Sequence, residues 1–138
     1  MGWRVLLVED NYDNFEMVRF LLERADYTVL GARTGREAVT AAQEHKPDVI
    51  LMDLSLPEMD GWEAAREIKN DPEIAGIPLI ALTAHTLPGD RQRAMEAGFD
   101  NYISKPINVP VFYDIVSEIL KTKEKKETKN KNKTTSRK

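Results

Sequence analysis

The sequence predicts a doubly wound α/β domain with a five-stranded parallel sheet, and two features of the chain support this fold. Five short runs are rich in Val, Ile and Leu, and their apolar residues are continuous more than alternating. That pattern is typical of strands buried on both faces of a parallel sheet. A helical pattern follows each run, as the crossovers between parallel strands require. The five runs are 5–8, 27–31, 49–52, 79–82 and 102–103.

The segments between and after these runs carry apolar residues at helical spacing. Thr34 and Glu37 form a predicted capping box at the start of the second helix, Gly98 stops the fourth, and Asn108 caps the fifth. Helix by helix, the apolar positions are Phe15, Val18, Leu22 and Ala25; Ala38, Val39 and Ala42; Trp62, Ala65 and Ile68; Ala94 and Ala97; and Phe112, Ile115, Val116 and Ile119.

Charge is unevenly distributed along the chain, whose net charge is −3. Residues 121–138 hold nine Lys or Arg and two Glu, for +7, so residues 1–120 carry −10. The basic segment contains no aliphatic or aromatic residue and cannot bury enough surface to offset the entropy of ordering. We therefore expect one folded domain over 1–122 and a disordered basic tail over 123–138. A tail that binds nucleic acid or an acidic partner is the alternative.

Composition excludes several classes of protein. The 138 residues include no cysteine, which rules out disulfides and thiolate metal sites. No apolar run approaches the roughly 20 residues that span a bilayer. The apolar stretch near the N-terminus is too short for a signal peptide. We expect a cytoplasmic protein that does not enter a membrane.

Polar residues follow four of the five strands at the edge where doubly wound sheets bind their ligands. Glu9 and Asp10 follow the first strand, Asp53 the third, Thr83 the fourth and Lys105 the fifth. Any one of these residues could be a cap or a solvated loop residue. Four such placements on one edge predict a functional site.

These side chains suit one kind of chemistry. Three crowded carboxylates repel one another unless a cation lies among them, and an all-oxygen site favours Mg²⁺. A carboxylate such as Asp53 can also act as a nucleophile and form an aspartyl-phosphate. Lys105 and Mg²⁺ would then neutralise the phosphoryl oxygens, and Thr83 would donate a hydrogen bond to one of them.

Glu9-Asp10, Asp53, Thr83-Ala84 and Lys105-Pro106 together resemble the complete signature of the receiver domain (CheY-like) of two-component response regulators. The resemblance covers residues 3–121, and the segment LPEMDGWE after Asp53 fits it. The segments VEDN and YISKPI are similar to stand-alone receivers of the DivK type and to receivers of hybrid histidine kinases.

The resemblance implies a flavodoxin-like fold with strand order 2-1-3-4-5. It implies that Asp53 accepts a phosphoryl group from a histidine kinase or a histidine phosphotransfer protein. Asp10 and Asp53 would bind Mg²⁺ through their side chains, Ser55 through its backbone carbonyl, and Glu9 through a water, with Mn²⁺ as a substitute. Glu9 is a departure, since many receivers carry Asp at that position, and it bears on metal affinity more than on function.

The resemblance also implies a switch and a cis peptide bond. Thr83 and Tyr102 would be the switch residues that report phosphorylation, and Pro106 would follow a cis bond. Donor contacts are expected at Asn14, Met17, Ile107 and Pro110.

The expected function is a phosphoacceptor signalling module of a two-component or phosphorelay system. It would not be an enzyme, apart from taking part in its own phosphoryl transfer and autodephosphorylation. Nothing after Lys121 reads as an output or DNA-binding domain, so we expect it to act on an unknown downstream protein. It would be a monomer or a phosphorylation-dependent dimer.

The alternative class is a phosphatase or a flavin-binding protein on the same scaffold. A haloacid-dehalogenase-like phosphatase requires a second Asp two residues after the nucleophile, where this chain has Ser55. A flavin protein requires a phosphate-binding loop after the first strand, and the acidic EDNYDN would repel phosphate without a metal.

Overall fold

The computed structural model describes residues 2–54, 61–84 and 89–136, with side chains as far as residue 124. Within these residues five strands alternate with five helices, as the sequence predicts. In chain order they are β1 (Arg4–Val8), α1 (Tyr12–Arg24), β2 (Thr28–Ala32), α2 (Gly35–His45), β3 (Val49–Asp53), α3 (Gly61–Asn70), β4 (Leu79–Thr83), α4 (Asp90–Glu96), β5 (Asn101–Ser104) and α5 (Val109–Ser136).

The five strands form one parallel sheet in the order β2-β1-β3-β4-β5, which confirms the expected topology. The register brings the polar strand ends together. Asp53 on β3 pairs with Leu82 on β4, and Thr83 at the end of β4 pairs with Ser104 at the end of β5. The sheet therefore delivers its functional side chains to one edge.

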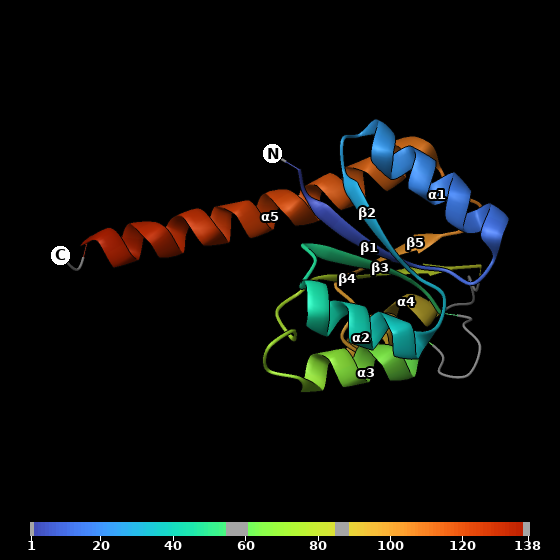
Figure 1. The fold of residues 1–138 in the computed structure, drawn as a ribbon, viewed down its shortest axis with the longest axis horizontal. Helices are drawn as coiled ribbons and strands as arrows, with labels where there is room; N and C mark the ends of the chain where they lie inside the picture. Colours follow the sequence, from blue (N-terminus) through green and yellow to red (C-terminus); the bar gives the residue numbers. More distant parts are fainter. Residues whose placement is uncertain (1, 55–60, 85–88, 137–138) are drawn as a thin grey trace.

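Each face of the sheet is covered by its own set of helices (Figure 1). Leu6 and Val8 of β1 pack with α2, α3 and α4, whereas Val5 and Leu7 pack with α1 and α5. Side chains alternate between the two faces of a strand, so a strand covered on both sides must be apolar throughout. This is why the runs in the sequence are continuous.

Local capping signals in the sequence are confirmed where the structure describes them. The Thr34 hydroxyl accepts a hydrogen bond from the Glu37 backbone N–H at 3.1 Å, and the Asn108 side chain accepts one from the Val111 N–H at 3.2 Å. Gly98 follows α4 with φ +108°, a left-handed conformation that favours glycine. The first helix ends one residue before the end of its predicted apolar stripe, because Ala25 is its C-cap residue.

The last helix continues past residue 122, where the sequence analysis expects a disordered basic tail, and that expectation stays a prediction. The backbone of α5 stays helical from Val109 to Ser136, and Figure 1 shows its far part extending away from the sheet. No Gly or Pro follows Pro110, and Lys and Glu are good helix formers, so nothing in the sequence interrupts the helix. A domain boundary near 122 stays a prediction.

A polar contact adds to the apolar packing of this helix on the sheet. The Lys123 ammonium donates to Asp48 Oδ1 at 3.0 Å, and Asp48 Oδ2 accepts the Arg4 backbone N–H at 2.7 Å. Asp48 thus joins the starts of β1 and β3 to α5. Among the helices searched, none is long and apolar enough to cross a membrane.

Deleting residues 124–138 should leave the melting temperature unchanged, because the last side-chain contact described for α5 is that of Lys123. The matched variant Lys123→Ala should lower the melting temperature by about 3 °C, since a partly buried ion pair contributes about 1 kcal/mol. Differential scanning calorimetry measures both. A fall of several degrees on deletion would mean that the tail packs against the domain.

The start of α3 lies unusually close to the end of β3. The Gly61 N–H donates to the Leu54 carbonyl at 3.2 Å. A Cβ on Gly61 would lie 2.6 Å from the Asp53 carbonyl oxygen and 2.8 Å from the Leu54 Cα. Both are backbone atoms that cannot swing aside, so only glycine fits at this position.

Gly61→Ala should therefore destabilise the fold by about 2 kcal/mol, the usual cost of forcing extra volume against a fixed neighbour. Gly76→Ala is the matched control, because a Cβ at Gly76 meets no atom within 4 Å. Urea unfolding of the two variants measures the difference. Equal midpoints for the two variants would contradict the close packing of α3 on β3.

Candidate functional site

The polar residues at the carboxyl edge of the sheet are mostly buried. Glu9, directly after β1, is 2% exposed; Asp53, the last residue of β3, is 6% exposed; and Thr83, the last residue of β4, is 1% exposed. Asp10 is exposed. Buried charged and polar groups are costly unless they are paired, so these side chains need partners at the site.

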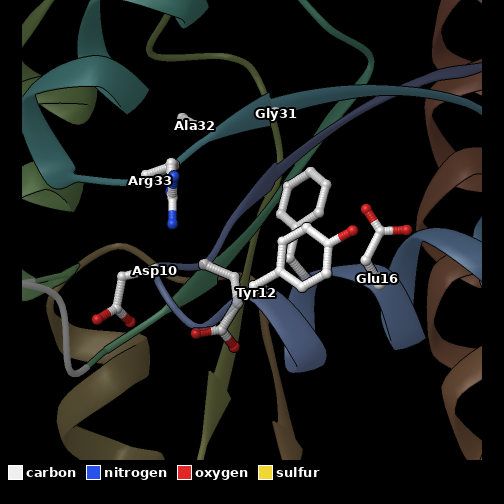
Figure 2. Close-up of a pocket in the computed structure, with 8 residues that line it drawn as sticks. Asp10, Tyr12, Glu16, Gly31, Ala32 and Arg33 are labelled. Carbon is white, nitrogen blue, oxygen red and sulfur yellow. The ribbon is translucent and has the colours of Figure 1, made fainter.

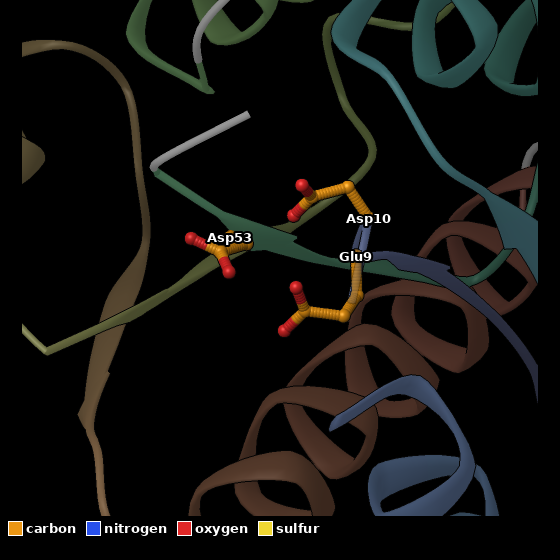
Figure 3. Close-up of side chains that lie close together, drawn as sticks. All are labelled: Glu9, Asp10 and Asp53. Atoms are coloured by element: carbon orange, nitrogen blue, oxygen red, sulfur yellow. The ribbon is translucent and has the colours of Figure 1, made fainter. Parts of the chain in front are cut away.

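Three carboxylates come together at this edge. Glu9, Asp10 and Asp53 each offer one oxygen, and these atoms all lie within 4.8 Å of one another (Figure 3). Their donor set consists of carboxylate oxygens alone, which fits a hard divalent cation such as Mg²⁺. Ser55, expected to add its backbone carbonyl, lies outside the described residues.

The Lys105 side chain places a positive charge beside these carboxylates. Its ammonium donates to Asp53 Oδ2 at 2.8 Å and to Glu9 Oε1 at 3.0 Å. Its backbone N–H donates to the Thr83 carbonyl at 2.8 Å, which holds the residue beside the end of β4. The following Lys105–Pro106 peptide bond is cis. Lys105 thus bridges two acids from two different strands.

The electrostatics of the site follow from burial and crowding. Burial raises the pKa of Glu9 above its ordinary value and the neighbouring Asp53 adds to this, although the Lys105 ammonium opposes both. Burial alone would lower the pKa of Lys105, but its bonds to Asp53 and Glu9 outweigh that effect and raise it. Protons therefore compete with a metal ion for Glu9 more strongly than for an ordinary carboxylate.

The charge balance leaves room for a divalent cation. When ionised, the three carboxylates and the one ammonium carry a net charge of −2. A bound Mg²⁺ would cancel it and relieve the repulsion among the acids. The site therefore has both the donor atoms and the charge that such an ion requires.

Thr83 and Tyr102 occupy neighbouring strands next to this cluster. Thr83 ends β4, and Tyr102 on β5 pairs with Ala81 two residues earlier on β4. Tyr102 is partly buried, and burial first and then the nearby Asp90 of α4 raise the pKa of its phenol. Tyr102 thus lies on the face of the sheet that α4 covers, near Asp90.

A pocket of about 190 Å³ adjoins the acidic cluster on its β2 side (Figure 2). Tyr12, Phe15, Gly31 and Arg33 line it together with the acids. In Figure 2 the exposed Arg33 side chain extends toward the side of the pocket where Asp10 lies. Sequence analysis did not single out Arg33, although it directly follows the second strand and so lies at the same edge as the other site residues.

Known proteins share this sequence and fold. Residues 5–117 match the response regulator receiver domain family. The chain is 44% identical over 116 residues to the polar-differentiation response regulators DivK of Brucella anthropi and Brucella ovis, a match covering 84% of this chain and 94% of each of those.

Solved structures agree with this result. One is the receiver domain of the sensor histidine kinase PA1611 from Pseudomonas aeruginosa, which has a magnesium ion coordinated in its active site cleft. It is 37% identical, with a TM-score of 0.81, and covers 87% of this chain and 98% of that one. The chemotaxis response regulator CheY4 of Vibrio cholerae is 29% identical, with a TM-score of 0.80 over 86% and 99% of the two chains.

The family match covers more than half of the chain, the DivK relatives are similar along nearly their whole length, and the sheet order and acidic edge agree with both. The chain belongs to the receiver-domain family of two-component response regulators.

Proposed function

We propose that Asp53 is the phosphoacceptor of this receiver and that its donor is a phosphohistidine on a histidine kinase or a histidine phosphotransfer protein. The observation that carries the proposal is the placement of Asp53, whose carboxylate lies 2.8 Å from the Lys105 ammonium and within the cluster of acids. A carboxylate that lies beside an ammonium and within a cluster able to hold a divalent cation can receive a phosphoryl group, because the two cations would neutralise its charge.

In the proposed reaction an Asp53 carboxylate oxygen attacks the phosphorus of the donor. The P–N bond to the donor imidazole breaks and its electron pair leaves with the imidazole. Lys105 moves its hydrogen bonds from the carboxylates to a phosphoryl oxygen, and the Thr83 hydroxyl donates to another. Charge stabilisation of this kind, with no proton transfer from the protein, suits a loose phosphoryl-transfer transition state.

Glu9, Asp10 and Asp53 are the residues that would hold Mg²⁺, with Ser55 proposed as a fourth ligand. The ion supplies positive charge beside the transferred phosphoryl oxygens. Mn²⁺, which accepts the same oxygen ligands, is proposed as a substitute. Hydrolysis of the aspartyl-phosphate at the same site would return Asp53 to its free form, so the module resets itself without turning over an external substrate.

The donor surface is proposed on α1 and the start of α5, the helices that cover one face of the sheet beside the site. The Tyr113 hydroxyl of α5 donates to the Leu21 carbonyl of α1 at 2.8 Å, which holds the two helices together. These two helices carry exposed apolar side chains: Met17 (48%) and Phe20 (58%) on α1, and Val109 (40%) and Val111 (48%) on α5. Such a patch favours a protein partner.

The four residues expected to contact the donor differ in exposure. Met17 and Pro110 are exposed, whereas Asn14 and Ile107 are partly buried. Met17 and Pro110 are therefore the stronger candidates. The downstream protein and the monomer or phosphorylation-dependent dimer remain proposals that the patch alone does not distinguish.

Asp53→Asn should abolish phosphorylation while preserving the fold, because the amide is a poor nucleophile of nearly the same shape. Full-length protein is incubated with acetyl phosphate and Mg²⁺, and intact mass spectrometry counts the hydroxylamine-sensitive phosphoryl groups. The wild type and the control Asp13→Asn, an exposed acid of α1, should each gain one. Wild-type labelling in excess EDTA should be lost as well.

Undiminished labelling of Asp53→Asn would place the acceptor elsewhere. Hydrolysis of a phosphate monoester such as p-nitrophenyl phosphate, in molar excess over protein, would instead favour the phosphatase alternative. These two results separate the acceptor assignment from the class of function.

Thr83 and Tyr102 are proposed to transmit phosphorylation to α4 and β5. A hydrogen bond from the Thr83 hydroxyl to a dianionic phosphoryl group would draw the end of β4 toward Asp53. Tyr102, which lies on β5 next to β4 and near Asp90 of α4, would turn into the space left behind. Such a bond is worth about 1.5–3 kcal/mol. Formed only in the active state, it would shift a two-state equilibrium roughly 10- to 150-fold.

The Thr83→Ala variant should therefore still accept a phosphoryl group on Asp53. The structural change that follows phosphorylation should reach α4 and β5 only weakly. NMR shifts on phosphorylation should spread over residues 89–97 and 101–115 in the wild type and shrink in the variant. Thr40→Ala, a hydroxyl loss on the exposed side of α2, is the control and should behave as the wild type. Shifts that stay near Asp53 even in the wild type would exclude this coupling.

A further inference from the structure

A groove between α3 and α4 lies apart from both the acidic cluster and the proposed donor surface. Its volume is about 500 Å³, and it is lined by Trp62, Arg66, Arg93, Glu96 and Ala97. We call it the α3–α4 groove. Two of its five residues are arginines, in a domain whose residues 1–120 carry a net charge of −10. It is therefore a local basic site on an acidic protein.

Trp62 is held in place at this groove. Its ring meets the ring of the buried Phe99 edge-on, with 6.1 Å between centroids, and the Arg93 guanidinium lies 5.2 Å from the Trp62 ring centroid. Contacts of both kinds are favourable and orient the indole. A fixed aromatic side chain loses little conformational entropy when a partner binds against it.

Arg66 and Arg93 together bring more positive charge to the groove than the packing of α3 against α4 requires. Arg66 projects from α3 and is exposed, and it forms no ion pair within residues 2–54, 61–84 and 89–124. Arg93 is 69% exposed, and its acidic partner Asp90 lies at 3.9 Å, the outer limit of an ion pair. The Glu96 carboxylate accepts a hydrogen bond from Gln92. Both arginines line the groove and are exposed, so their guanidiniums are accessible to an anion.

We propose that the α3–α4 groove binds an acidic segment of a partner protein. Carboxylates of the segment would pair with Arg66 and Arg93, and an apolar part of it would lie against Trp62. Trp and Arg are the side chains that most often dominate protein–protein binding energy, and guanidinium–carboxylate pairs are strong and directional. The inference does not rest on the proposed phosphoryl transfer, since the groove contains none of the residues assigned to it.

The test uses the full chain with Trp3→Phe, so that tryptophan emission reports Trp62 alone. An acetylated and amidated hexaglutamate peptide is titrated into it, and the same titration is followed by ¹⁵N amide shifts. Emission should change in a saturable manner. Arg66→Gln and Arg93→Gln should each weaken the affinity read at Trp62 about threefold, the scale of one surface ion pair.

Arg91→Gln is the matched control, because it removes the same charge from the exposed side of α4 without touching the groove. It should leave the affinity unchanged. Peptide bound to the basic C-terminal segment would appear as amide shifts beyond residue 121 and would not follow the Arg66 substitution.

Three results would overturn the proposal. One is Trp62 emission that stays unchanged when the peptide has saturated the ¹⁵N amide shifts elsewhere in the chain. Another is equal weakening by Arg91→Gln, which would show a general charge effect. The third is tighter binding of adenosine monophosphate than of the peptide at Trp62, which would assign the groove to a nucleotide. Acetyl phosphate labelling should be normal in all the arginine variants, which separates this test from failure of the proposed function.

Discussion

Burial of two acids at one edge of the sheet is the constraint on which the site depends. Glu9 and Asp53 lie at the ends of adjacent buried strands, where unpaired charge is costly. The Lys105 ammonium, 3.0 Å from one and 2.8 Å from the other, offsets that cost. One ammonium does not balance three carboxylates, and this remaining negative charge is what makes the site suited to a divalent cation and to phosphoryl chemistry.

The helices around the sheet divide the surface into regions with different chemistry. On one face, α1 and α5 carry exposed apolar side chains, whereas on the other face α3 and α4 carry a partly buried tryptophan and two exposed arginines. Gly61 links the second region to the site, because it lets α3 start against the backbone of Asp53. The sheet thus connects one acidic edge to two surfaces of different chemistry.

Most of the fold could be predicted because its signals are local. Continuous apolar runs such as 49–52 mark strands covered on both faces, and caps such as Thr34 and Asn108 mark helix starts. The extent of α5 could not be predicted in this way. A basic segment without apolar residues indicates weak burial but carries no signal that breaks a helix, so composition and backbone conformation point to different outcomes.

By itself the sequence determined which residue types end each strand, and parallel topology then required Glu9, Asp10, Asp53, Thr83 and Lys105 to share an edge. Only the tertiary structure decided which oxygens meet the Lys105 ammonium, that Arg33 lies beside the cluster, and that Arg93 stacks on Trp62. The reason is distance along the chain. Strand order brings remote segments together, but side-chain contacts between them depend on register, helix orientation and rotamers, which no local pattern specifies.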